Sequence, residues 1–224
     1  MKTKKEAIYI IETLKEYYPD CRCSLDFGSP FEMMIAVMLS AQCTDERVNK
    51  TTPSLFAKYN TPEAIAKMDL KELEEIIHPC GFYKNKAKNI KACSQKLLDD
   101  FGGIVPNDME SLQSLPGVGR KSANVIMLEA FHNPVGIAVD THAKRISNKV
   151  GFSSQEEPVK IEQDLLKAIP KKYYFDVNHL LVWHGRNICM ARKPQCEECP
   201  INTNCNFYQN LKDNERLLEP LKIS

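Results

Sequence analysis

The chain has 224 residues, 43% of them hydrophobic and 26% charged, and its formal net charge at pH 7 is +1. This length accommodates one domain or two small ones, and so small a net charge does not indicate a nucleic-acid partner. No apolar run reaches the ~18 residues that a membrane span requires, and the basic N-terminus does not lead into the apolar core of a secretion signal. We therefore expect a cytoplasmic protein that is neither secreted nor embedded in a membrane.

Apolar residues recur at helical spacing along almost the whole chain. The pattern begins at residues 7–14 and returns at residues 31–39 and 161–169. Capping residues or prolines introduce several such segments, at residues 29–30, 61–63, 106–108 and 157–158. Strand-like alternation occurs only in short pieces, so we predict an all-α fold of short helices. The helical pattern breaks after Phe131, and this break indicates a domain junction.

A stretch without acidic residues carries a run of lysines. Its members are Lys84, Lys86, Lys88, Lys91 and Lys96. A solvated helix face is the simpler interpretation of such a run, and contact with phosphate is the alternative. The sequence alone leaves both open.

Residues 115–123 read LPGVGRKSA and form a tight connection between two helical patterns, the second of which runs over residues 120–130. Gly117 and Gly119 permit a sharp turn and the close approach of another backbone. The second helix begins with unpaired amide groups, which suit an anionic phosphate oxygen because the helix dipole lies behind them. A plain turn between two packed helices is the alternative on these residues alone.

A polar segment, VDTH at residues 139–142, follows the expected junction and precedes another helical pattern. Asp is a favoured N-cap residue, so one role for Asp140 is to cap this helix. A carboxylate can also stabilise positive charge that develops during a reaction and help to move protons. The two roles are compatible, because a capping side chain has a fixed orientation. His142 either lines the same pocket or is a structural histidine.

Four of the nine cysteines lie close together near the C-terminus, with six, two and five residues between successive members. They are Cys189, Cys196, Cys199 and Cys205. This clustering favours a metal site in a reducing compartment over a disulfide framework. Four thiolates can hold either a tetrahedral zinc ion or a cubane iron-sulfur cluster. We assign no function to the other five, Cys21, Cys23, Cys43, Cys80 and Cys93.

Three of these motifs resemble those of one enzyme family. The string at residues 115–123 resembles the helix-hairpin-helix element of DNA glycosylases. The VDTH segment is similar to that of the endonuclease III superfamily, and the cysteine spacing is similar to the [4Fe-4S] loop of endonuclease III and its adenine-mismatch relatives. The resemblance extends from Ser29 to Cys205, with the motifs in the family's order.

The resemblance implies an all-α fold of two helical domains. One is a helical barrel, residues 23–133, that contains the helix-hairpin-helix element. The other is discontinuous, residues 1–22 plus 134–224, and carries the [4Fe-4S] loop at residues 189–205. The cluster would be held by Cys189, Cys196, Cys199 and Cys205.

The resemblance also assigns roles to two residues. Lys121 would be the nucleophile that attacks the sugar C1′ and forms a Schiff base, a reaction open to an amine but not to an always-protonated arginine. Asp140 would assist departure of the base, and β-elimination would then cut the strand.

Further positions are implied to contact DNA. Four consecutive residues of the hairpin would bind the DNA backbone: Gly117, Val118, Gly119 and Arg120. Gln42 would fill the gap that the extruded nucleotide leaves, and Phe82, where the family commonly has leucine, would wedge the opposite strand. A buried core aromatic is the alternative for Phe82. His142 would line the pocket.

The implied function is that of a bifunctional DNA glycosylase and abasic-site lyase, acting on oxidised pyrimidines in double-stranded DNA. The enzyme would be a monomer in the cytoplasm, associated with the nucleoid if the source is prokaryotic. A monofunctional adenine-mismatch glycosylase is one alternative, although that group generally lacks the lysine and has a further C-terminal domain. A non-catalytic DNA-binding protein is the other.

Overall fold

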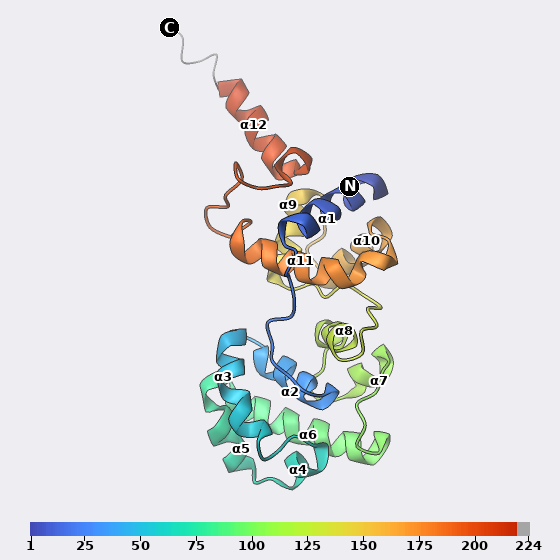
Figure 1. Ribbon diagram of the computed structural model, residues 1–224, viewed down its shortest axis with the longest axis vertical. Helices are drawn as coiled ribbons and strands as arrows, with labels where there is room; N and C mark the ends of the chain where they lie inside the picture. Colours follow the sequence, from blue (N-terminus) through green and yellow to red (C-terminus); the bar gives the residue numbers. More distant parts are fainter. Residues whose placement is uncertain (219–224) are drawn as a thin grey trace. The chain divides into compact units, whose positions relative to one another are not determined.

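The computed structural model describes residues 1–218, and every regular element in that range is helical, which confirms the predicted all-α class (Figure 1). The α-helices are α1 (Lys4–Tyr17), α2 (Pro30–Ser40), α3 (Asp45–Phe56), α4 (Pro62–Lys67), α5 (Leu70–Ile77), α6 (Tyr83–Phe101), α7 (Met109–Ser114), α8 (Arg120–Glu129), α9 (Thr141–Val150), α10 (Pro158–Ala168), α11 (Tyr174–Asn187) and α12 (Asn206–Leu218). Three short 3-10 helices are η1 (His78–Cys80), η2 (Lys171–Tyr173) and η3 (Asn202–Asn204). Among residues 1–218, no helix is long and apolar enough to cross a membrane.

The predicted helix starts are confirmed, and side-chain caps explain three of them. Ser29 accepts a hydrogen bond from the Glu32 amide at the start of α2. Thr61 caps α4 and Asp108 caps α7 in the same way. Each cap pairs an amide that the first helical turn leaves without an internal partner. The α10 helix begins with Pro158, whose missing N–H is no loss at that position.

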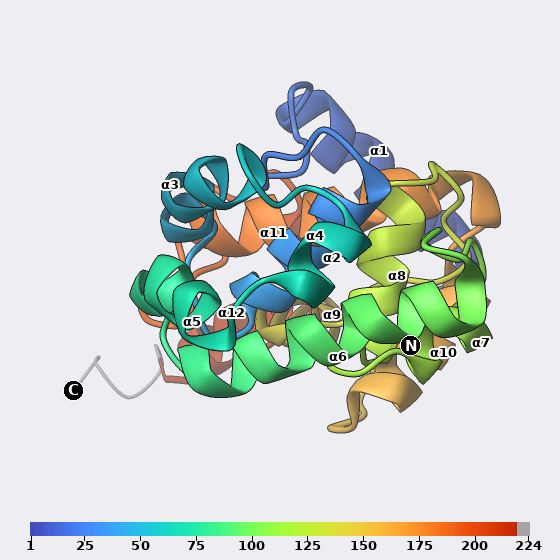
Figure 2. The same ribbon diagram turned by 90° about the horizontal axis from the view of Figure 1, so that it is seen from below.

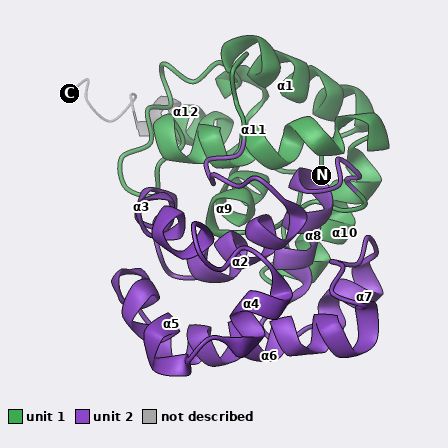
Figure 3. Ribbon diagram, turned by 60° about the horizontal axis from the view of Figure 1, so that its bottom comes forward, with its two compact units in different colours: residues 1–22, 135–224 green, residues 23–134 purple. Residues whose placement is uncertain are grey.

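The chain divides into two compact units, residues 1–22 with 135–224 and residues 23–134 (Figure 3). We call them unit 1 and unit 2. The assignment of residues 23–133 and of residues 1–22 plus 134–224 as the two domains stays a prediction.

Unit 2 is organised around α2. Every residue from Met33 to Leu39 is at most 5% exposed, so this helix is surrounded by its neighbours. It packs against α3, α6 and α8. The α6 helix, 19 residues long, runs beside α4 and α5 (Figure 2). The α7 and α8 helices lie against each other and form the helix-hairpin-helix element.

Unit 1 combines the N-terminal helix with the C-terminal part of the chain. The α11 helix packs against both α1 and α9, and α9 also contacts α10 and α12. Buried side chains from α1 and α11, such as Ile10, Leu14 and Leu180, share one core with Phe152. The N-terminal helix is therefore part of the core that supports α9, which follows Asp140.

Candidate functional site

The turn between α7 and α8 requires glycine at one position. Gly117 has a φ of +81°, a conformation that side-chain-bearing residues rarely adopt. A Cβ atom there would also lie 2.8 Å from the Met38 Cε atom and 3.0 Å from the Asn89 Cβ atom. The turn is closed by a hydrogen bond from the Val118 amide to the Leu115 carbonyl, 3.1 Å long. The hairpin thus packs closely against α2 and α6.

The start of α8 has the features of an anion site. Gly119 is its N-cap, with no side chain to pair the first amides, and Gly119 and Arg120 are both exposed. These amides and the positive end of the helix dipole are available to a phosphate oxygen. Val118 is only 4% exposed, so its side chain anchors the turn and only its backbone is left for a contact.

Lys121 lies on the exposed side of the first turn of α8. Ala123, Ile126 and Met127 of the same helix are buried in the core of unit 2. The apolar side of α8 therefore fixes the helix while the amine stays accessible, next to the hairpin.

Asp140 caps α9, as predicted. Its Oδ1 atom accepts a hydrogen bond from the Ala143 amide at 2.8 Å, and its side chain is half-buried. The cap uses one carboxylate oxygen and fixes the direction of the group. The second oxygen remains for other chemistry.

His142 is held by its neighbours in unit 1. Its Nδ1 atom lies 3.1 Å from the Arg145 Nη2 atom, and a Cβ atom at Gly185 would come within 2.8 Å of the histidine ring. Arg145 donates further hydrogen bonds to the carbonyls of Gly185 and Cys189. Sequence reasoning missed Arg145, which connects α9 with the end of α11 and the first cysteine of the loop.

The two residues expected to enter DNA have unusual backbones. Gln42 has a φ of 54° and Phe82 a φ of 48°, both in the left-handed region, which costs a side-chain-bearing residue on the order of 1 kcal/mol. Phe82 is 66% exposed, so the interpretation as a core aromatic is wrong. Both residues line one pocket of unit 2, together with Asn85, Lys86, Asn89 and Gly117. The hairpin and the two loops therefore border a common surface of unit 2.

The lysine run does not form one solvated face. Lys86 and Lys91 turn inward, and each donates hydrogen bonds to main-chain carbonyls. Lys96 pairs with Asp100. Lys84 and Lys88 are exposed. One feature of the sequence does indicate that Lys86 is buried. It lies in the apolar stripe of α6 and shares the buried face of that helix with Ile90 and Leu97.

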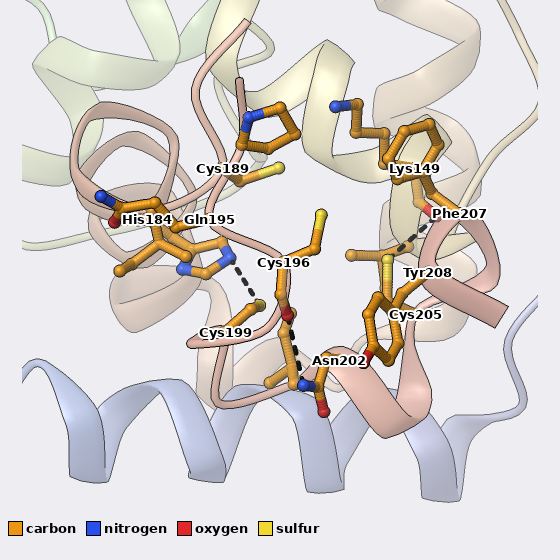
Figure 4. Close-up of a pocket in the computed structure, with 14 residues that line it drawn as sticks. Lys149, His184, Cys189, Gln195, Cys196, Cys199, Asn202, Cys205, Phe207 and Tyr208 are labelled. Carbon is orange, nitrogen blue, oxygen red and sulfur yellow. Dashed lines mark hydrogen bonds between the residues drawn. The ribbon is translucent and has the colours of Figure 1, made fainter. Parts of the chain in front are cut away.

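The four clustered cysteines line a single pocket in unit 1 (Figure 4). None of the four forms a disulfide, and they are close enough for the charge on one sulfur to influence the pKa of another. The His184 Nε2 atom lies 3.5 Å from the Cys199 Sγ atom, and its Nδ1 atom lies 3.1 Å from the Tyr18 hydroxyl. The Cys205 thiol donates to the Lys149 carbonyl at 3.4 Å. Residues of α9, α11 and α12 thus form walls of this pocket, and Tyr18, just after α1, holds His184.

The chemistry of the pocket suits a metal-containing group. Burial raises the pKa of the Cys199 thiol to about 11 and also raises the pKa of Cys189 and Cys196. Such thiols stay protonated in water at neutral pH, and they release the proton to solvent when a metal binds the sulfur. Within residues 1–218, no three acidic, histidine or cysteine side chains converge closely enough to hold one metal ion. Four sulfur atoms around one pocket fit a larger cluster.

Comparison with known families defines the class of protein. Residues 35–171 match the family described as "HhH-GPD superfamily base excision DNA repair protein". Residues 189–205 match the "iron-sulfur binding domain of endonuclease III". The fold and site are therefore those of a helix-hairpin-helix base-excision DNA repair protein with an iron-sulfur domain.

Individual relatives narrow the class. Endonuclease III of Synechocystis sp. is 46% identical over 202 residues, which cover 90% of this chain and 92% of the relative. Endonuclease III of Escherichia coli is 41% identical, with 93% and 98% covered. A solved structure described as a trapped endonuclease III-DNA covalent intermediate matches this chain with a TM-score of 0.89 at 42% identity. The match covers 95% of this chain and 100% of the solved chain. A thermostable thymine-DNA glycosylase, 24% identical, has a TM-score of 0.84 and shows the fold alone.

The chain belongs to the endonuclease III family. It is accordingly a bifunctional glycosylase and abasic-site lyase of base-excision repair, and it has a [4Fe-4S] cluster as its cofactor. The predicted family, function and cofactor are confirmed. The monofunctional and the non-catalytic alternatives are not favoured.

Proposed function

We propose that this enzyme removes oxidised pyrimidines from double-stranded DNA and cleaves the resulting strand through a Schiff base on Lys121. The observation that carries this proposal is the position of Lys121, exposed in the first turn of α8 directly after the hairpin. One element then binds the DNA backbone and presents the amine. Two solved structures described as a non-covalent endonuclease III-DNA complex and a trapped covalent intermediate support a DNA partner.

Each step follows from the chemistry of an amine. The Lys121 Nζ atom, once it has lost its proton, attacks C1′, and the bond from C1′ to the base nitrogen breaks. The base leaves with the bonding electrons and takes up a proton. The attack leaves two protons on a positively charged Nζ, and Nζ gives up one of them. The sugar ring then opens, its ring oxygen takes up a proton, and C1′ and Nζ are left joined as a protonated imine. The imine acidifies the C2′ proton, whose removal expels the 3′ phosphate, and water then releases Lys121.

Asp140 is proposed to act in the first of these steps. Its carboxylate stabilises the positive charge that develops on the sugar as the base departs, and it accepts a proton from the attacking amine. Its cap on α9 supports the role, because a fixed carboxylate needs no reorganisation during the reaction.

The remaining residues are proposed to bind DNA. Main-chain amides of residues 117–120 and the Arg120 side chain hold the backbone, Gln42 fills the gap left by the extruded nucleotide, and Phe82 wedges the opposite strand. The exposure of both loop residues supports these roles. His142 contacts the pocket of the extruded nucleotide.

The cysteine loop is proposed to hold the cluster through Cys189, Cys196, Cys199 and Cys205. When bound, the cluster supplies four metal-thiolate bonds that fix residues 189–205. Arg192 and Lys193 are exposed on this loop, and Arg186 is exposed just before it. We infer that they bind phosphate, and that the enzyme acts as a monomer in the cytoplasm, at the nucleoid in a prokaryote.

The test of the nucleophile is borohydride trapping. A duplex with one abasic site is incubated with the enzyme, sodium borohydride is added, and the cross-linked peptide is identified by mass. The expected adduct is on Lys121, disappears in Lys121→Ala, and persists in Lys88→Ala, which removes another exposed lysine of unit 2. An adduct at a different lysine, or none with strand cleavage intact, would overturn the assignment.

A further inference from the structure

Lys86 is a lysine in the interior of unit 2. It lies on α6 among buried apolar residues and is only 7% exposed. Its Nζ atom donates to the Leu39 carbonyl at 2.8 Å and to the Cys80 carbonyl at 2.9 Å. One carbonyl belongs to the last turn of α2 and the other to η1. A single ammonium group therefore joins three elements.

The two carbonyls lie a short distance along the chain before the two loop residues with left-handed backbones. Leu39 precedes Gln42, and Cys80 precedes Phe82, with only two and one residues between them. Both Gln42 and Phe82 are in the left-handed region, although neither is glycine. Such conformations persist only where the surrounding structure holds them, and they cluster at functional sites. Main-chain contact adds a third link, because the Lys86 amide donates to the Phe82 carbonyl at 3.1 Å.

Packing alone does not explain a lysine at this position. Burial strips water from an ammonium group, and this burial lowers the pKa of Lys86. A leucine or methionine would fill the apolar stripe without that cost. What the lysine adds is a set of three directional donors, two of which reach carbonyls in two different elements, α2 and η1.

We propose that Lys86 is a positioning residue for nucleotide extrusion: it holds the Gln42 loop and the Phe82 loop in the conformation that enters DNA. The inference rests on the function proposed above for those two residues. Lys86 itself does not touch the DNA, because its ammonium group is engaged by the protein's own carbonyls. It acts on the reaction only through the two loops.

The same helix provides a matched control. Lys91 also donates from Nζ to main-chain carbonyls, at 2.8 Å to Ala66 and 3.2 Å to Ile65, with a further bond to Met68. These carbonyls lie at the end of α4, away from the residues that line the pocket of Gln42 and Phe82. Lys91→Met thus removes a similar set of hydrogen bonds and leaves both loops in place.

The experiment compares Lys86→Met and Lys91→Met on a duplex with thymine glycol opposite 2-aminopurine. Fluorescence of 2-aminopurine reports whether the opposite base is unstacked, and kcat/KM for base release reports the reaction. We expect Lys86→Met to lose the fluorescence rise and at least about tenfold in kcat/KM, because each carbonyl loses a charged donor. Lys91→Met should keep a fluorescence rise and a kcat/KM within about twofold of wild type. Both variants are assayed at a temperature below their melting points.

Two results would overturn the inference: wild-type fluorescence and kcat/KM in Lys86→Met, or equal losses in Lys91→Met. Gln42→Ala and Phe82→Ala separate this failure from failure of the proposed function. If they lose both signals while Lys86→Met keeps them, only the role of Lys86 is wrong. If they keep both signals, the role of the loops is wrong. If Lys86→Met does not fold, Lys86→Gln takes its place, because glutamine retains a donor group on a shorter side chain. We expect Lys86→Gln to give a smaller loss of the fluorescence rise and of kcat/KM. Wild-type values of both in Lys86→Gln would overturn the inference.

Discussion

Asp140 has two tasks that separate substitutions can distinguish. Asp140→Asn keeps an oxygen that can accept from the Ala143 amide, so the cap on α9 is retained and the charge is lost. We expect base release from an oxidised-pyrimidine duplex to fall about 100-fold or more, with little change in melting temperature. Asp140→Ala removes the cap as well and should also lower the free energy of unfolding by about 1 kcal/mol. Full base release by Asp140→Asn would show that the carboxylate only caps.

Glu129 makes the stability of the enzyme depend on pH. It lies on α8, is 8% exposed, and burial raises its pKa to about 7. A folded-state pKa above the unfolded value means that this residue destabilises the protein as pH rises through that range. At pH well above 7, ionised Glu129 should cost up to about 3 kcal/mol relative to Glu129→Gln.

The measurement is the melting temperature of wild type and Glu129→Gln from about pH 5 to about pH 8. The curves should meet at the acidic end and diverge towards the alkaline end, with the variant the more stable. Parallel curves over the whole range would show that the pKa of Glu129 is not raised.

At the scale of elements, the hairpin depends on the backbone of one glycine. Gly117→Ala meets both a positive φ and close contacts with α2 and α6. We expect a loss of about 1–3 kcal/mol in the free energy of unfolding, together with weaker binding to abasic-site duplex. Gly119→Ala is the stability control, because a Cβ atom there has no neighbour within 4 Å and φ is negative. Equal melting temperatures for the two variants would contradict this account.

The elements themselves were largely predictable, because their signals are local. Ser29 and Thr61 mark helix starts through bonds to amides three residues ahead, and apolar spacing marks the buried faces. The position of Lys86 in the apolar stripe of α6 indicates that it is buried, but the hydrogen-bond partners of Lys86 and Lys91 were not predictable, since they are carbonyls of other helices. The exposure of Phe82 likewise depends on a left-handed backbone that no propensity indicates. Family resemblance, rather than local signals, supplied the roles of the site residues.

At the scale of the molecule, charge is balanced, with 30 basic and 29 acidic residues. The hairpin accordingly offers DNA neutral backbone amides, and few cations accompany them. Besides the nucleophile Lys121, four exposed cations lie in or beside the two proposed DNA-binding segments: Arg120, Arg186, Arg192 and Lys193. DNA affinity should therefore depend on a small number of phosphate contacts rather than on a long-range positive field.

Salt dependence of binding tests this expectation. Each neutralised phosphate contributes about −0.9 to the slope of log affinity against log salt concentration, so four cations give a slope no steeper than about −4. Fluorescence anisotropy with a duplex that carries a stable abasic analogue, at several salt concentrations, measures the slope. Arg192→Gln should make it shallower by about 0.9, whereas Lys50→Gln, on the exposed side of α3, should leave it unchanged. A slope much steeper than about −4 would require more cationic contacts than these segments contain, and would shift attention to the exposed Lys84 and Lys88 of α6.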